Sequence, residues 1–210
     1  MKGPTLSKSR ILSGWQCHKR LWLEMHEPDK AEETPSMRRA YRVGHEAGRA
    51  AMELFPQGRL NGPADPDEFP DLDAALRETR ERLAGPGPLT LFEATFEHVG
   101  VLVRCDVLIR DADGRLRLVE VKDSTKVKPV NHIVCAVQAW VLDGNGLRPD
   151  RIELAHIDNR FVYPGGGDYA GLFAFEDLTD KIVPVLAHVP EWLETYRALL
   201  AGPGLLYTSP

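Results

Sequence analysis

Residues 101–122, with the sequence VLVRCDVLIRDADGRLRLVEVK, contain two apolar runs separated by a polar turn. The runs 101–110 and 116–121 are rich in Val, Leu and Ile, which favour strands, and the Asp and Gly residues of 111–114 are typical of tight turns. The pattern predicts a β-hairpin. In an antiparallel pair joined by this turn, Asp106 faces a position near 119, and a slip within one pleat places it beside Glu120.

Three charged side chains stand out in this hairpin, Asp106, Glu120 and Lys122. Alternate residues of a strand share a face, so Glu120 and Lys122 point to the same side. Carboxylate and ammonium groups are costly to bury unless they are paired or used. Two carboxylates and a lysine on one face form the oxygen-rich kind of site that suits Mg²⁺ or Mn²⁺. The alternative interpretation is a solvated charge pair without chemistry.

The residues on either side extend the hairpin into a larger sheet. A strand at 91–97 and a turn at 98–100 complete a three-stranded antiparallel meander. A helix at 131–142 then provides a crossover, so that a strand at 151–159 returns parallel to the strand that ends at Lys122. Gln138 is a polar residue in that otherwise apolar helix. Glu93, in the first strand, is either an outer carboxylate of the site or, as we favour, half of a structural ion pair.

The whole chain, 1–210, is expected to form a single domain with a core at 89–160. The part before it, 1–85, is predicted to be mainly helical, with helices at 9–25, 37–55 and 72–83 and a loop at 56–70. His45 lies in the second of these helices, where small neighbours permit close approach of another element. The part after the core, 161–210, is expected to form a hairpin and a helix split by prolines.

The composition narrows the class of protein. No apolar run approaches the roughly 18 residues of a membrane span, and the basic N-terminus is not followed by the apolar stretch of a signal peptide. The three cysteines form no Cys-x-x-Cys pair, so we expect free thiols and a cytoplasmic location without a membrane partner. The net charge is −5, yet residues 1–50 carry ten Lys/Arg against six Asp/Glu, a pattern typical either of a polyanion-facing N-terminal region or of a solvated helical surface.

In their order and separations, His45, Asp106, the Glu120-x-Lys122 strand end and Gln138 resemble the PD-(D/E)xK nuclease superfamily. The resemblance is strongest to its RecB-like branch, which includes CRISPR-associated exonucleases and the nuclease domains of recombination helicases. The stretches LSKSR (6–10) and QCHKRLWL (16–23) also resemble the opening of uncharacterised bacterial RecB-like proteins. The resemblance covers most of the first three quarters of the chain. It implies an α/β, restriction-endonuclease-like core, a mixed sheet with an antiparallel meander flanked by helices, behind an N-terminal helical region.

The resemblance also implies a Mg²⁺- or Mn²⁺-dependent nuclease that hydrolyses DNA phosphodiester bonds in single-stranded or end-bearing DNA. The implied metal ligands are His45, Asp106, Glu120 and the carbonyl of Val121. The implied catalytic residues are Asp106, Glu120, Lys122, which would position water or stabilise developing charge, and Gln138, which would help to hold metal or substrate. The N-terminal basic residues and those after the Glu120 strand are expected to contact DNA, namely Lys8, Arg10, Lys19, Arg20, Lys126 and Lys128.

Two departures from the family pattern keep a second function open. Leu142 stands where RecB-like proteins usually have an aromatic residue. Many relatives hold an iron–sulfur cluster with four cysteines, but here only Cys17 is in a family-like position, so we expect no cluster. The alternative is therefore a nucleic-acid-binding or assembly module that keeps the nuclease fold without turnover, and a third option is an α/β domain with no polyanion partner. The chain is also expected to be a truncated or solitary nuclease module, and its oligomeric state stays open.

Overall fold

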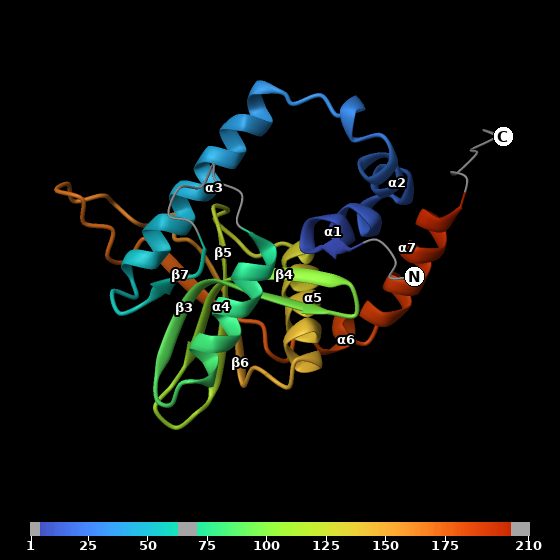
Figure 1. The fold of residues 1–210 in the computed structure, drawn as a ribbon. Helices are drawn as coiled ribbons and strands as arrows, with labels where there is room; N and C mark the ends of the chain where they lie inside the picture. The colour runs from blue at the N-terminus through green and yellow to red at the C-terminus, as the bar shows by residue number, and fades with distance from the viewer. Residues whose placement is uncertain (1–4, 63–70, 203–210) are drawn as a thin grey trace.

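A seven-stranded mixed β-sheet forms the centre of the molecule, in the order β2-β3-β4-β5-β6-β7 with β1 paired to β4 (Figure 1). This computed structural model describes residues 5–62 and 71–202, so the end of the predicted 56–70 loop, from 63 onward, lies outside the described residues. The strands are β1 Leu6–Ser7, β2 Arg59–Leu60, β3 Leu89–His98, β4 Val101–Arg110, β5 Leu116–Lys122, β6 Arg151–Ile157 and β7 Phe173–Asp177.

The predicted meander and crossover are confirmed. Strands β3, β4 and β5 pair antiparallel, and β6 returns parallel to β5 after helix α5, Pro129–Gly144. The register pairs Val107 with Val119, which sets Asp106 opposite Glu120 rather than opposite residue 119. Strand β7 pairs antiparallel with β6, but it begins only at residue 173, because the preceding loop contains three consecutive glycines with positive φ.

The remaining helices are α1 Lys8–Gln16, α2 His18–His26, the 3₁₀ helix η1 Pro28–Lys30, α3 Pro35–Glu53, α4 Leu72–Ala84, α6 Val183–Leu186 and α7 Val189–Ala201. The helix predicted at 9–25 is two helices, and the break is the extended backbone of Cys17. Gly14 lies inside α1, where an added Cβ would come within 2.8 Å of the Tyr196 ring. The split near Pro184 and Pro190 is confirmed, since each proline lies in the first turn of a new helix.

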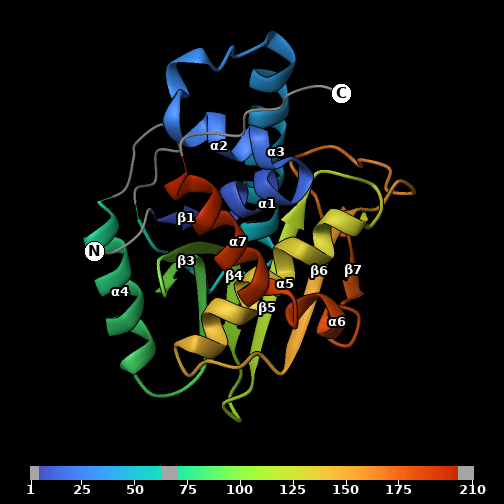
Figure 2. The same cartoon turned by 90° about the vertical axis from the view of Figure 1, so that its right-hand side faces the viewer.

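Two apolar clusters cover the two faces of the sheet. On one face, side chains of α1, α2, α5 and α7 pack on β3, β4 and β5 around residues such as Leu108 and Leu118 (Figure 2). On the other face, α3 packs Ala47 and Ala51 in a cluster with Val119. The architecture is therefore α/β with helices on both sides of a mixed sheet. Within the described ranges, every helix is too short or too polar to cross a membrane.

Candidate functional site

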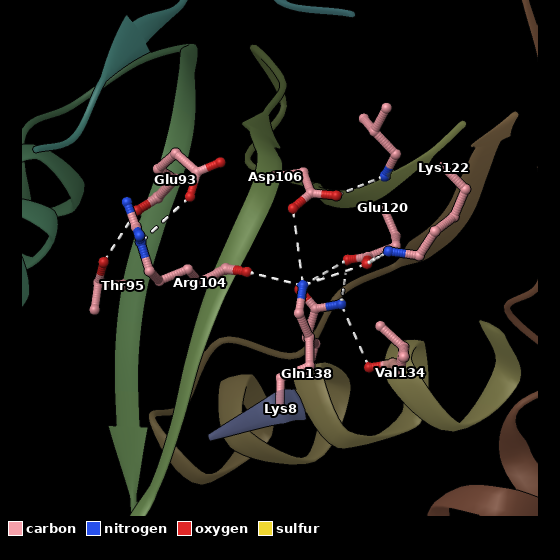
Figure 3. Close-up of polar contacts among 10 residues, drawn as sticks. Lys8, Glu93, Thr95, Arg104, Asp106, Glu120, Lys122, Val134 and Gln138 are labelled. Carbon is pink, nitrogen blue, oxygen red and sulfur yellow. Dashed lines mark hydrogen bonds and ion pairs between the residues drawn. The ribbon is translucent and has the colours of Figure 1, made fainter. Parts of the chain in front are cut away.

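Five side chains from four elements meet beside strands β4 and β5 (Figure 3). Asp106 comes from β4, Glu120 and Lys122 come from β5, Gln138 comes from α5, and Lys8 is the first residue of α1. They lie on the face of the sheet that α1 and α5 cover. The sequence therefore brings four of its predicted catalytic residues together, with one lysine that was not expected among them.

Glu120 is the centre of this cluster, and its side chain is fully buried. Its Oε1 accepts a hydrogen bond of 2.5 Å from Lys122 Nζ, and its Oε2 accepts one of 3.0 Å from Lys8 Nζ and one of 2.7 Å from Gln138 Nε2. A buried carboxylate is tolerated only when such partners replace water. Gln138 is fully buried too, and its Oε1 has no hydrogen-bond partner among the residues that the structure describes.

Asp106 lies at an irregular step of the sheet. Its Oδ2 accepts a hydrogen bond of 2.7 Å from the backbone N–H of Val121, and its Oδ1 lies 3.8 Å from Lys8 Nζ. Side chains two residues apart in a regular strand lie on the same face of the sheet. Cys105 and Val107 instead pack in the apolar clusters on opposite faces. The alternation therefore changes phase at Asp106, which turns its carboxylate toward the end of β5.

Glu93 makes the matching change in the neighbouring strand. The register pairs Phe92 with Val107 and Ala94 with Cys105, so Glu93 stands opposite Asp106. Its φ is 56°, in the left-handed region that residues with a Cβ rarely adopt. Its carboxylate lies 3.3 Å from the Arg104 guanidinium, which is the ion pair that we favoured from the sequence. Burial, with the nearby Asp106 charge, raises the pKa of Glu93 to about 6.

The charged groups of the cluster shift one another's pKa values. Burial opposes the ionisation of Glu120, but Lys122 and Lys8 outweigh it and lower the pKa of Glu120 to about 2. For Asp106, burial and the Glu120 charge raise the pKa, and the two lysines offset this only in part. The pKa values of Lys8 and Lys122 are both raised, because their attraction to the carboxylates exceeds the effect of burial. Two carboxylates thus face two ammonium groups.

The structure does not bring His45 into this cluster. His45 lies on α3, the helix that packs on the opposite face of the sheet, and its ring contacts Tyr41 with 4.1 Å between centroids. Across the described part of the chain, no three His, Cys, Asp or Glu side chains are grouped closely enough to hold a metal ion. Val121 lies beside the cluster, where its N–H binds Asp106.

The residues expected to contact DNA are spread over two regions. Lys19 and Arg20 are exposed on α2, where Arg20 pairs with Glu24, and Arg10 on α1 donates to the Thr5 carbonyl. Lys126 and Lys128 are exposed in the loop between β5 and α5. Lys8 is different, because its ammonium lies inside the carboxylate cluster.

The two departures from the family pattern also have structural positions. Leu142 is fully buried in the core one turn after Gln138, so it fills apolar space. Cys17 is exposed at the break between α1 and α2, whereas Cys105 and Cys135 are buried, and the thiols of all three are free.

The sequence predicts Lys8 only as a DNA contact, because no local pattern marks it as a residue of the carboxylate cluster. Its position depends on the pairing of Leu6 with Val101, which joins segments about 95 residues apart in the chain. Ser7 then caps α1 by accepting from the Arg10 N–H, which fixes the direction in which Lys8 leaves the helix. The Ser7 cap predicts a helix start, but it does not predict the partner strand.

No family model and no curated protein matches this chain. Among solved structures, one described as "Crystal structure of SSO0001" is similar with a TM-score of 0.43 and 9% sequence identity. The similarity covers 93% of this chain and 78% of the other. At this level nothing about the site or the activity follows from it.

The donor atoms of the cluster fit a hard divalent cation in type. Asp106 and Glu120 offer carboxylate oxygens, and Gln138, whose Nε2 donates to Glu120, also carries an Oε1 without a hydrogen-bond partner among the described residues. Mg²⁺ and Mn²⁺ prefer oxygen ligands of this kind. Lys122 adds a positive charge at the open end of β5, where its side chain is 31% exposed. The cluster thus combines carboxylate oxygens with a partly exposed positive charge.

Proposed function

We propose that this protein is a metal-dependent nuclease with a restriction-endonuclease-like core, which hydrolyses DNA phosphodiester bonds in single-stranded or end-bearing DNA. The observation that carries the proposal is the convergence of Asp106, Glu120, Lys122 and Gln138 around one buried carboxylate. These residues were selected from the sequence for that chemistry. Their meeting at one point is what a catalytic cluster requires and what a set of solvated surface charges does not.

The order of the elements supports the same proposal. A helical region is followed by the antiparallel strands β3, β4 and β5, then by α5 and the parallel strand β6. The acidic residues lie at the end of β5 and on its antiparallel neighbour, and the amide comes from the crossover helix. The RecB-like resemblance implies this arrangement of its functional residues.

Each residue has a role that follows from its position. Asp106 and Glu120 would hold Mg²⁺ or Mn²⁺, with Gln138 Oε1 as a neutral oxygen donor near them. When bound, such an ion neutralises phosphate oxygens and lowers the pKa of a bound water. Lys122 would stabilise the negative charge that develops on the phosphate, because its ammonium is held at the cluster yet is partly exposed.

The substrate would approach over exposed basic residues near the cluster. Lys126 and Lys128 follow Lys122 in the loop between β5 and α5, and Lys19 and Arg20 lie on α2. Phosphate contacts from such side chains bind DNA without reading its sequence. A nuclease of this type would act in the cytoplasm, where the three free thiols would stay reduced.

One observation favours the second candidate, a nucleic-acid-binding module without turnover. Both carboxylate oxygens of Glu120 are already hydrogen-bonded to lysines. A protein that used the cluster only for stability would have this arrangement. It would bind DNA with strong salt dependence and would cleave none of it with any divalent ion.

The decisive experiment is cleavage of end-labelled single-stranded and duplex DNA in Mg²⁺ or Mn²⁺ by the wild type and two variants. Asp106→Asn keeps an acceptor for the Val121 N–H and removes the charge, and Lys122→Met removes the ammonium. Lys30→Met, at an exposed ion pair with Glu27, is the matched control. We expect cleavage by the wild type and the control and a loss of at least about 100-fold in both site variants. Equal activity in all four proteins would refute the assignment.

A further inference from the structure

The Lys8 ammonium lies between the two carboxylates of the cluster and bridges them. Lys8 Nζ is 3.0 Å and 3.3 Å from the two Glu120 oxygens, 3.8 Å from Asp106 Oδ1 and 3.2 Å from the carbonyl oxygen of Arg104 (Figure 3). Four oxygens from three residues thus surround one positive charge. Carboxylate and carbonyl oxygens are also the atoms that Mg²⁺ and Mn²⁺ select.

Lys122 does not have this position. It is two residues from Glu120 on the same strand, and its Nζ binds only the Oε1 of that carboxylate within hydrogen-bonding distance. Lys8 reaches the cluster from α1 and contacts both acidic residues. Lys8 is therefore the lysine that contacts both carboxylates, whereas Lys122 contacts Glu120.

The charge balance limits what can be added to the cluster. With Asp106 ionised, the two acidic residues carry two negative charges, and Lys8 and Lys122 carry two positive charges. A divalent cation bound beside all four would leave two uncompensated positive charges at a buried carboxylate, which is unfavourable. If Lys8 has moved away before the same cation binds, only one uncompensated positive charge is left.

The Lys8 side chain borders the solvent. It is 23% exposed, whereas the Glu120 side chain that it contacts is fully buried. The backbone on both sides is held independently, by the pairing of Leu6 with Val101 and by the Ser7 cap of α1. The buried Gln138 donates its Nε2 to Glu120, and its Oε1 has no hydrogen-bond partner among the described residues.

We infer that Lys8 is a built-in cation that occupies the place of a divalent metal ion between Asp106 and Glu120, so that the ion binds by displacing the Lys8 ammonium. This inference rests on the proposed metal-dependent function. Lys8 then has a positioning role, because it holds the side chains of Asp106 and Glu120 in place before the metal arrives, and it weakens the affinity of the site for the metal.

The test is calorimetric titration of the whole chain with Mn²⁺, without DNA. We expect Lys8→Met to bind Mn²⁺ at least about tenfold more tightly than the wild type, which corresponds to about 1.4 kcal/mol. Lys8→Arg, which keeps the charge, should bind no more tightly than the wild type, and the exposed Lys30→Met should match the wild type. The double variant Lys8→Met with Glu120→Gln should lose the gain, because the gained affinity comes from that carboxylate.

A second readout is the change of the unfolding temperature on addition of Mn²⁺. Lys8→Met leaves two carboxylates facing one lysine, so it should be less stable than the wild type without metal and should gain more from metal. If Lys8→Met does not fold alone, cooperative unfolding restored by refolding in Mn²⁺ supports the inference, and failure to fold in Mn²⁺ overturns it.

The outcomes separate the two proposals. If the wild type binds Mn²⁺ through Glu120 and Lys8→Met binds it equally or more weakly, displacement of Lys8 is wrong and the metal site stands. If no variant binds Mn²⁺, both the metal site and the role of Lys8 are wrong.

Discussion

The left-handed backbone of Glu93 makes a quantitative prediction, because it reverses the usual order of glycine and alanine in a strand. Glycine in the middle of a strand is normally less stable than alanine by about 0.5–1 kcal/mol. A residue with a Cβ at the φ of 56° found for Glu93 costs about 1–2 kcal/mol, a cost that glycine does not have. Both Glu93→Gly and Glu93→Ala remove the carboxylate and its ion pair with Arg104. The difference between their free energies of unfolding therefore isolates the effect of the backbone conformation.

We expect Glu93→Gly to be more stable than Glu93→Ala by about 1 kcal/mol, which is the left-handed penalty less the ordinary disadvantage of glycine. The measurement is the free energy of unfolding from urea transitions, with the two slopes compared to check that the unfolding surface is unchanged. For a domain of this size the difference corresponds to about 2–4 °C in the unfolding temperature.

Two neighbouring positions serve as controls. Ala94 is fully buried and lacks a positive φ, so Ala94→Gly should be destabilising. Val99, in the turn between β3 and β4, has a φ of 46°, so Val99→Gly should be more stable than Val99→Ala. If Glu93→Ala equals or exceeds Glu93→Gly in stability while Val99 behaves as expected, the left-handed backbone at Glu93 is wrong, and so is the account of how Asp106 turns toward β5.

Three further predictions concern the polar cluster and are all measured as free energies of unfolding in the absence of divalent metal. Glu120→Gln should be destabilised by about 3 kcal/mol or more, because it leaves two lysines without their buried carboxylate, and a loss below about 1 kcal/mol would contradict the pairing. Gln138→Leu should lose about 1.5–3 kcal/mol with its charge-assisted bond to Glu120, and an unchanged stability would mean that this bond is not formed. Glu93→Gln should remove a pH dependence. The folded-state pKa of Glu93 is raised from 4.5 to about 6. Its protonation therefore contributes fully to the stability of the fold below pH 4.5, and this contribution is lost as the pH rises through about 6. Relative to this variant, the wild type should gain up to about 2 kcal/mol on acidification from about pH 7 to about pH 4.5, and identical pH profiles would refute the raised pKa.

The sequence predicts the local parts of the fold because each depends on short-range chemistry. The turn at 111–114 sets the hairpin of β4 and β5, and the run of apolar residues in α5 sets a helix of the length that a parallel crossover needs. The pairing of Asp106 with Glu120 follows from this hairpin to within one residue. The position of Gln138 near Glu120 can also be predicted, because the crossover helix must pack on the strands that it connects.

The remaining parts depend on contacts between distant segments, which no local pattern encodes. The change in alternation at Glu93 and Asp106 occurs in two neighbouring strands at once, and the residue pattern of neither strand marks it. Lys8 enters the cluster only because β1 pairs with β4. His45 was grouped with the carboxylates by chain order, which does not specify that α3 packs on the opposite face of the sheet.

The N-terminal segment links the stability of the fold to the state of the cluster. Leu6 is fully buried on the same two-residue strand that precedes Lys8, so docking of this strand fills apolar space and delivers an ammonium to two carboxylates in one step. Undocking would expose Leu6 and leave Asp106 and Glu120 with Lys122 alone, which is unfavourable without another cation. A divalent ion would remove the second of these costs but not the first. The segment should therefore stay docked through Leu6 when a metal binds, while only the side chain of Lys8 moves, so that the core of the domain remains intact during loading of the site.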